Sequence, residues 1–152
     1  MAQTPTIGLI QNTPESFDGY TLVSANSATQ SHLIDNCGRV INQWESDYRM
    51  GESSYLLEDG SLLRTARVAG SVFFGGGIGG RLERFSWDGA LEWSFDYASE
   101  EAHHHHDMAV LPNGNILLIA WEYHSNEEAQ ALGRLGDSPL WPPQIVEIEP
   151  VG

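Results

Sequence analysis

The sequence predicts an all-β protein, and three features of the 152-residue chain carry that prediction. Short apolar runs rich in Leu, Ile, Val, Phe, Tyr and Trp recur along the chain, as is typical of strands. Turn residues separate these runs, because Asn-Gly and Asp-Gly supply the positive φ angles of tight hairpins. Almost no segment has the 3.6-residue apolar period of a helix. The turns are Asp59-Gly60, Asp88-Gly89 and Pro112-Asn113-Gly114.

A repeated pattern organises these runs. Two turn glycines, Gly38 and Gly89, lie 51 residues apart. Two further turn glycines, Gly60 and Gly114, lie 54 residues apart. Two independent anchors with nearly one period predict an internal repeat. The similar segments are 33–44 with 54–65, and 84–93 with 108–119.

A third copy begins near the end of the chain, where residues 145–152 have the pattern of residues 82–89. Each repeat of roughly 50 residues is expected to hold four short antiparallel strands, which is the blade of a β-propeller. We therefore predict one partial propeller domain over residues 1–152, with about two and a half four-stranded blades. Its repeats are assigned to residues 20–68 and 80–123, with a third starting at 144.

Blade number constrains the assembly. A closed propeller has roughly four to eight blades, so a shorter stack leaves apolar blade faces uncovered. One interpretation is that the chain is the front of a longer protein whose remaining blades complete the ring, and its end at Gly152 inside a predicted hairpin favours this. The other is a homo-oligomer, for example three copies that together close a six-bladed ring.

One segment between the second and third repeats predicts a helix. The insertion near residues 125–134 has Ser125 as a cap and Glu128 three residues later, which is a capping box. Gly133 is a natural end for the helix. The prolines that follow argue against further regular structure. We interpret the insertion as a surface loop with one or two helical turns, or as a lid over the site.

The charge of the chain excludes several functions. Seven basic residues, all arginine, face 21 acidic ones, which gives a net charge of −14. Such a chain is expected to bind neither nucleic acid nor anionic membranes. The absence of lysine excludes Schiff-base and P-loop lysine chemistry. Cys37 is the only cysteine, so no intrachain disulfide can form. We expect a soluble protein, and the compartment stays open between cytoplasm and periplasm.

The outstanding candidate site is a run of four histidines, 103–106, followed by Asp107. The run precedes an apolar strand that leads into a turn, which in propellers is commonly the innermost strand. Simple strand alternation would place His104 and His106 on one side of this strand. The matching positions of the first repeat are Gly51, Glu52 and Ser53, so packing of the repeat does not require histidines there.

Several chemistries suit such a cluster. Imidazole can act as a nucleophile, as an acid or base, or as a metal ligand, and a solvated histidine loop is the alternative without function. We assign no metal and no cofactor. Arg64 and Arg67, on or just after the strand that follows Asp59-Gly60, can clamp a sulfate or carboxylate if they face the channel, or else pair with surface acids.

Two further patterns are interpreted as structural. The glycine run 75–80 fits a dinucleotide-binding pattern, but a strand follows it where that motif needs a helix. We expect this run to be a flexible connection between blades. Trp44 and Trp93 are expected to occupy equivalent repeat positions and to pack within the blades.

Taken together, these motifs resemble the arylsulfotransferase (aryl-sulfate sulfotransferase) family. The resemblance runs from about Ile7 to the end of the chain and covers the front portion of the family's propeller domain. The histidine pair with its aspartate, followed by Leu-Pro-Asn-Gly-Asn, is its most specific part. The segments that carry it are Asp18–Leu22, Leu33–Asp35, Tyr55–Thr65, Trp87–Gly89, His105–Asp107, Leu111–Asn115 and Trp121–Tyr123.

The resemblance implies a six-bladed propeller that transfers a sulfuryl group from a phenolic sulfate to a phenol through a sulfated histidine. The motif match places His105 and His106 at the channel in contact with substrate, and we assign them catalytic roles. We assign substrate contacts to His104, Asp107 and Arg64. The resemblance also places the family's nucleophilic histidine in a later blade. The alternative is a propeller module without catalysis that binds a ligand or a metal and closes by homo-oligomerisation.

Overall fold

The computed structural model describes residues 8–69 and 75–150 and confirms the all-β prediction. Ten strands and one short helix make up this part of the chain. The strands are β1 (Tyr20–Ser24), β2 (Gln30–Asp35), β3 (Val40–Glu45), β4 (Met50–Leu56), β5 (Leu62–Arg67), β6 (Gly80–Phe85), β7 (Leu91–Asp96), β8 (Ala102–Val110), β9 (Ile116–Glu122) and β10 (Pro143–Ile148), and the helix is α1 (Asn126–Ala131). The predicted turn glycine Gly152 lies outside the described residues.

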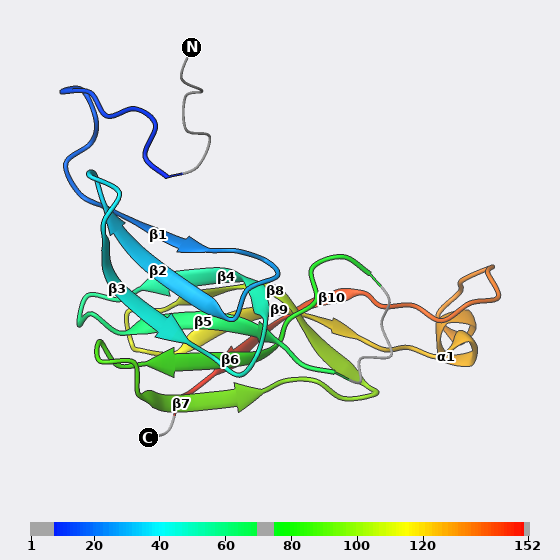
Figure 1. The fold of residues 1–152 in the computed structure, drawn as a ribbon. Coiled ribbons are helices and arrows are strands. Elements are labelled where there is room, and N and C mark those ends of the chain that lie inside the picture. The colour runs from blue at the N-terminus through cyan, green and yellow to red at the C-terminus, as the bar shows by residue number, and fades with distance from the viewer. Residues whose placement is uncertain (1–7, 70–74, 151–152) are drawn as a thin grey trace, which may run out of the picture.

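The strands form three antiparallel sheets (Figure 1). The first sheet has the order β1-β2-β3, the middle sheet β4-β5-β6-β7, and the third sheet β10-β9-β8. Each sheet is built from strands that are neighbours in sequence and pair antiparallel, and β9 and β10 are joined through the segment that contains α1. Figure 1 shows the first sheet lying over the middle one, and the helix projecting from the stack at the end away from the N-terminus.

The sheets are offset from the sequence repeats. Residues 20–68 supply all of the first sheet and also β4 and β5 of the middle sheet. The same strand register nevertheless recurs in successive sheets. Thr65 pairs with Leu82 between β5 and β6, and the corresponding residues Ile119 and Ile145 pair between β9 and β10. Strands β5 and β6 of the middle sheet are therefore equivalent to β9 and β10 of the third.

Two apolar cores hold the sheets face to face. Alternate residues of each strand point to opposite faces, so the adjacent residues Leu62 and Leu63 serve different cores. Each fully buried leucine of this kind contributes about 1.5–3 kcal/mol relative to an exposed one. The core between the first and middle sheets contains Leu33, Trp44, Leu62 and Phe85, and the core between the middle and third sheets contains Leu63, Leu82, Met108, Ile116 and Leu118.

The two repeated tryptophans pack as expected but do not occupy equivalent positions. Trp44 is buried in one core, and Trp93 packs against the other. Trp44 pairs with Ser31 across the sheet, whereas Trp93 pairs with Arg84. In the repeat, Arg84 corresponds to Leu33, which lies two residues after Ser31. The two tryptophans are therefore offset by two residues in register. The equivalence expected from sequence alone is wrong in this detail.

The predicted helix is confirmed. Ser125 accepts a hydrogen bond from the backbone N–H of Glu128, and the Glu128 carboxylate accepts one from the backbone N–H of Ser125, which completes the capping box. Gly133 has a φ of 98° and ends the helix, with its N–H donating to the carbonyl of Gln130. Regular structure resumes at Pro143, at the first position of β10, where a strand tolerates proline.

No helix in the described parts of the chain is both long enough and apolar enough to cross a bilayer.

Candidate active site

The candidate site lies where the edge strands of the three sheets meet. Strand β1 contacts β4, and β4 contacts β8. Between them lies an open pocket of about 400 Å³. Polar side chains from β4 and β8 dominate its wall. The lining residues are Leu22, Ser24, Met50, Glu52, Ser53, Ser54, Tyr55, His106 and Asp107.

Matching bulges in β4 and β8 shape this pocket. In β4, Met50 pairs with Ala66 and Ser54 with Arg64, so three residues of β4 lie opposite one residue of β5. In β8 the register shifts in the same way between His104 and the residue four positions on. Residues 51–53 and 105–107 therefore occupy equivalent bulges, as the repeat predicted. Bulges re-aim side chains at an edge, which brings both segments to one pocket.

The bulge overturns the expected alternation of the histidines. His103 and His104 are both fully buried, although they are adjacent in sequence. His105 and His106 are half-buried, and their rings lie side by side with centroids 4.3 Å apart. Simple alternation would have separated His105 from His106. Three unpaired residues in the bulge break the two-residue period of the strand.

His104 is held as a neutral imidazole within the fold. Its Nδ1 accepts a hydrogen bond from the backbone N–H of Gly80 at 3.3 Å, and its Nε2 donates to the carbonyl of Asp107 at 3.2 Å. Burial lowers its pKa to about 4, and the hydrogen bond to Asp107 only partly opposes this. A second proton on the ring would sit on Nδ1 and would point at the backbone N–H of Gly80. His104 therefore positions the bulge, and its ring is closed off from the pocket that it was expected to share with substrate.

His105 and His106 form the exposed part of the cluster. The ring of His105 stands edge-on to Trp121 with centroids 3.8 Å apart. The Nδ1 atoms of His105 and His106 are hydrogen-bonded to each other. Burial first, and then the neighbouring His106, lower the pKa of His105. The neutral imidazole is thereby favoured at neutral pH, and the neutral form is the one that acts as a base or nucleophile.

Asp107 joins the two bulges. The Tyr55 hydroxyl donates to its carboxylate at 2.8 Å, and the backbone N–H of Met108 donates to the same oxygen at 2.9 Å. The Ser53 hydroxyl donates to the carbonyl of His106 at 2.7 Å. Burial alone would raise the pKa of Asp107, but the hydrogen bonds from Tyr55, Met108 and Ser53 outweigh it and the pKa is lowered. The aspartate thus stays ionised beside His106.

Glu52 lies in the left-handed region of backbone conformation, with a φ of 92°. A non-glycine residue there stores strain, and such strain concentrates at functional sites. Its carboxylate pairs with Arg67 at 3.1 Å. The charge of Glu52 also partly opposes the lowering of the His105 pKa by burial and by His106. Arg67 is therefore paired with a residue that lines the histidine pocket.

Arg64 takes a different place from the one predicted. Its side chain is fully buried between the first and middle sheets. It donates to the carbonyl of Thr29 at 2.6 Å and to that of Tyr48 at 3.1 Å, and it lies 3.9 Å from the Glu83 carboxylate. A guanidinium engaged in this way cannot reach a ligand in the pocket. The predicted substrate contact at Arg64 is corrected to a role in the core.

The glycine run was missed as part of the site. It joins β5 to β6 within one sheet, so its interpretation as a connection between blades is wrong. Three of its glycines, Gly77, Gly79 and Gly80, lie directly against the histidines. A Cβ at Gly77 would lie 2.8 Å from Cε1 of His105, and one at Gly79 would overlap the His104 ring. Only a chain without side chains can approach the imidazoles this closely.

Gly79→Ala is therefore expected to lower the free energy of unfolding by about 1–3 kcal/mol, because the added methyl group displaces His104. The matched control is Gly76→Ala, since a Cβ at Gly76 meets no atom within 4 Å. That variant is expected to stay within about 0.5 kcal/mol of the parent. Urea unfolding of both variants measures the difference. Equal stabilities would contradict close packing of the run on the histidines.

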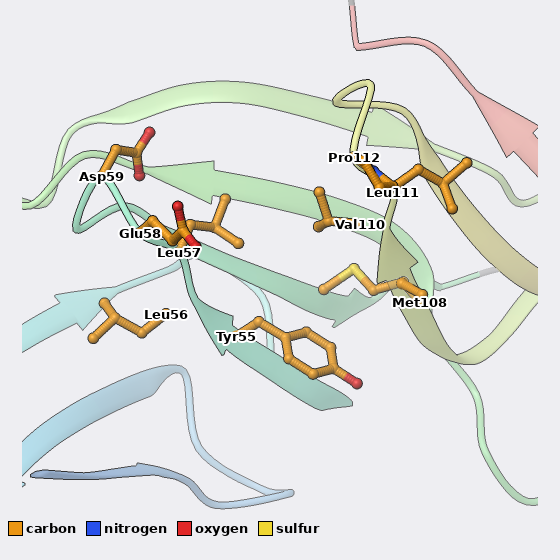
Figure 2. A pocket seen from close by; sticks show the side chains of 10 residues that line it. Tyr55, Leu56, Leu57, Glu58, Asp59, Met108, Val110, Leu111 and Pro112 are labelled. Atoms are coloured by element: carbon orange, nitrogen blue, oxygen red, sulfur yellow. The ribbon is translucent and has the colours of Figure 1, made fainter.

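A second, apolar pocket of about 750 Å³ adjoins the site (Figure 2). It lies between the ends of β4 and β8 and the turns that follow them, and Tyr55 lines both pockets. Figure 2 shows the Tyr55 ring beside the Met108 side chain at one end of it. The other lining residues are Leu56, Leu57, Glu58, Asp59, Ala109, Val110, Leu111 and Pro112.

Within residues 8–69 and 75–150, no group of three or more His, Cys, Asp or Glu side chains is arranged to hold a metal ion. No protein-family model matches the chain, and no curated protein matches its sequence significantly.

Proposed function

We propose that the three sheets are successive blades of a β-propeller, and that the histidine pocket serves sulfuryl transfer from a phenolic sulfate to a phenol. The twin bulges of β4 and β8 are the observation that carries the proposal. They supply an imidazole pair, His105 and His106, at the edge strands that would line a propeller channel. An apolar pocket next to them suits an aromatic ring.

The chemistry requires only groups of this kind. An imidazole nitrogen attacks sulfur, the bond from sulfur to the aryl oxygen breaks, and the phenolate leaves. The oxygen of a second phenol then attacks sulfur, the N–S bond breaks, and the phenol proton passes to a neighbouring base. His106, on the pocket wall, is assigned the attack on sulfur that the resemblance implies for a histidine of a later blade, and His105 is the adjacent neutral imidazole. The ionised Asp107 stabilises positive charge on His106.

Arg67 is assigned the contact with the sulfate that was expected of Arg64. Its guanidinium pairs with the strained Glu52 and is partly exposed, so it can turn toward an anion. Pairing with Arg67 also offsets the negative charge that Glu52 would otherwise present to a sulfate. An arginine in this place stabilises the oxygens of a transferring group through charge-assisted hydrogen bonds.

The test is release of 4-nitrophenol from 4-nitrophenyl sulfate in the presence of phenol. Arg67→Ala is expected to lower kcat/KM by about 10-fold to 100-fold, since a hydrogen bond to a charged group is worth about 1.5–3 kcal/mol. His106→Ala is expected to lower kcat/KM by more than about 1000-fold, because it removes the attacking nitrogen. His124→Ala is the matched control, because His124 lies away from the pocket. The proposal fails if the parent chain releases no 4-nitrophenol, or if the pocket variants match the control.

A further inference from the structure

The outer face of the third sheet is apolar and open. In β9 and β10 the residues Ile116, Leu118 and Ile148 point toward the middle sheet and pack in the core. Strand alternation places Leu117, Ile119 and Ile145 on the opposite face. Ile145 is 66% exposed there. No sheet covers this face in the part of the chain that the structure describes.

The face of the middle sheet that is equivalent by the repeat is buried. Leu63 and Leu82 of the middle sheet occupy the positions of Leu117 and Ile145. The third sheet covers them, and they are 1% and 0% exposed. The open face of the third sheet therefore repeats a face that is buried one sheet earlier. A further sheet of the same kind is the surface that fits it.

The opposite end of the stack offers the complementary face. By the same register, Thr21, Val23 and Ile34 of the first sheet correspond to Ile116, Leu118 and Ile148 of the third. Those three residues of the third sheet pack against the middle sheet. In the first sheet the equivalent positions point away from the middle sheet, and Val23 is 43% exposed.

We propose that the chain associates with a second copy of itself, head to tail, with the third sheet of one copy packed on the first sheet of the other. The contact continues the stacking that already joins the three sheets within one chain. Two such contacts between two copies close a ring of six sheets, and closed head-to-tail contacts give a discrete assembly. This inference rests on the repeat equivalence, and sulfuryl transfer can fail without affecting it.

Light scattering coupled to size-exclusion chromatography tests the proposal through the mass of the assembly. The parent chain is expected to elute with twice its mass of 16.8 kDa. Ile145→Glu and Val23→Glu are each expected to give a monomer, because each places a charge in the contact. Leu132→Glu is the control, since Leu132 is 84% exposed beside α1 and lies off both faces. Circular dichroism checks that all variants stay folded.

A mixture of the two variants tests the head-to-tail arrangement more directly. The Ile145→Glu chain keeps an intact first sheet, and the Val23→Glu chain keeps an intact third sheet. Head-to-tail packing therefore predicts that mixing restores one contact and a mass of two chains. A parent that is monomeric at all concentrations, an assembly of another copy number, or a mixture that stays monomeric would each overturn the proposal.

Discussion

Glu83→Ala is expected to lower the free energy of unfolding by about 3–5 kcal/mol, because it leaves a buried arginine without its counter-ion. Glu83 is 1% exposed, and its carboxylate accepts hydrogen bonds from Ser46 at 2.7 Å and from Arg81 at 3.0 Å. Arg64 lies on its other side, fully buried. Burial lowers the pKa of Arg64 and the Glu83 charge opposes that shift, so loss of the carboxylate leaves the charge of the guanidinium uncompensated in the core.

Two controls separate this effect from the loss of any ion pair. Asp96 also pairs with Arg81, but its carboxylate side chain is 59% exposed, so Asp96→Ala is expected to cost about 0–1 kcal/mol. The double variant Arg64→Leu/Glu83→Val installs the residues that the third sheet has at the equivalent positions. It is expected to recover most of the stability, since an apolar pair can replace a buried ion pair. Urea unfolding of all three variants gives the comparison. A single Glu83→Ala as mild as Asp96→Ala would contradict the buried network.

Acid is expected to destabilise the protein through His104 as the pH falls from 6.5 to about 4. The pKa of His104 is lowered in the folded state, so in this window the unfolded chain binds a proton that the folded chain refuses. Stability is therefore complete above pH 6.5 and is lost as the pH falls toward the folded pKa. At about 1.4 kcal/mol per pH unit, the loss approaches about 3 kcal/mol.

The matched variant is His104→Met, because Met50 occupies the equivalent position just before the bulge in β4 and is buried there. Methionine cannot take up the proton, so the difference in stability between parent and variant should change by about 3 kcal/mol across the window. Urea unfolding at a series of pH values gives both curves, and protonation of carboxylates affects them equally. Parallel curves would mean that His104 does not carry the acid sensitivity.

Local signals in the sequence predicted most of what proved correct. Turn glycines, apolar runs and the Ser125–Glu128 capping box involve residues close together in the chain, and the strands and α1 follow from them. The repeat also matched residues 51–53 with residues 105–107. The two bulges contain the same number of residues, so the spacing of the repeat is unchanged. The propeller itself, with its blade count, stays a prediction.

The site was less predictable because its geometry depends on residues distant in sequence. The bulge that separates His104 from the half-buried pair arises from pairing with β9, and alternation within one strand cannot reveal it. The burial of Arg64 depends on Glu83, which joins it across the sheet. One signal was present: Arg64 aligns with Leu118 in the repeat, and a leucine at that position indicates the core.

The glycine run shows a third limit. Glycine was interpreted as flexibility, whereas Gly77 and Gly79 are needed for close approach to the imidazoles of β8. The sequence shows that these two residues lack a side chain, but it does not show which neighbouring residues leave no room for one. The contact of Gly77 and Gly79 with the histidines depends on how the segment before β6 packs against β8.

In the proposed reaction the imidazoles of His105 and His106 meet the sulfuryl group of a phenolic sulfate. The most direct test of this proposal is a titration of the protein with 4-nitrophenyl sulfate, followed by NMR of the imidazole resonances. We predict saturable shifts for His105 and His106, weakened in Arg67→Ala, and none for His32 or His124. Unchanged resonances of His105 and His106 at saturating ligand, or equal shifts for all the histidines, would contradict the account.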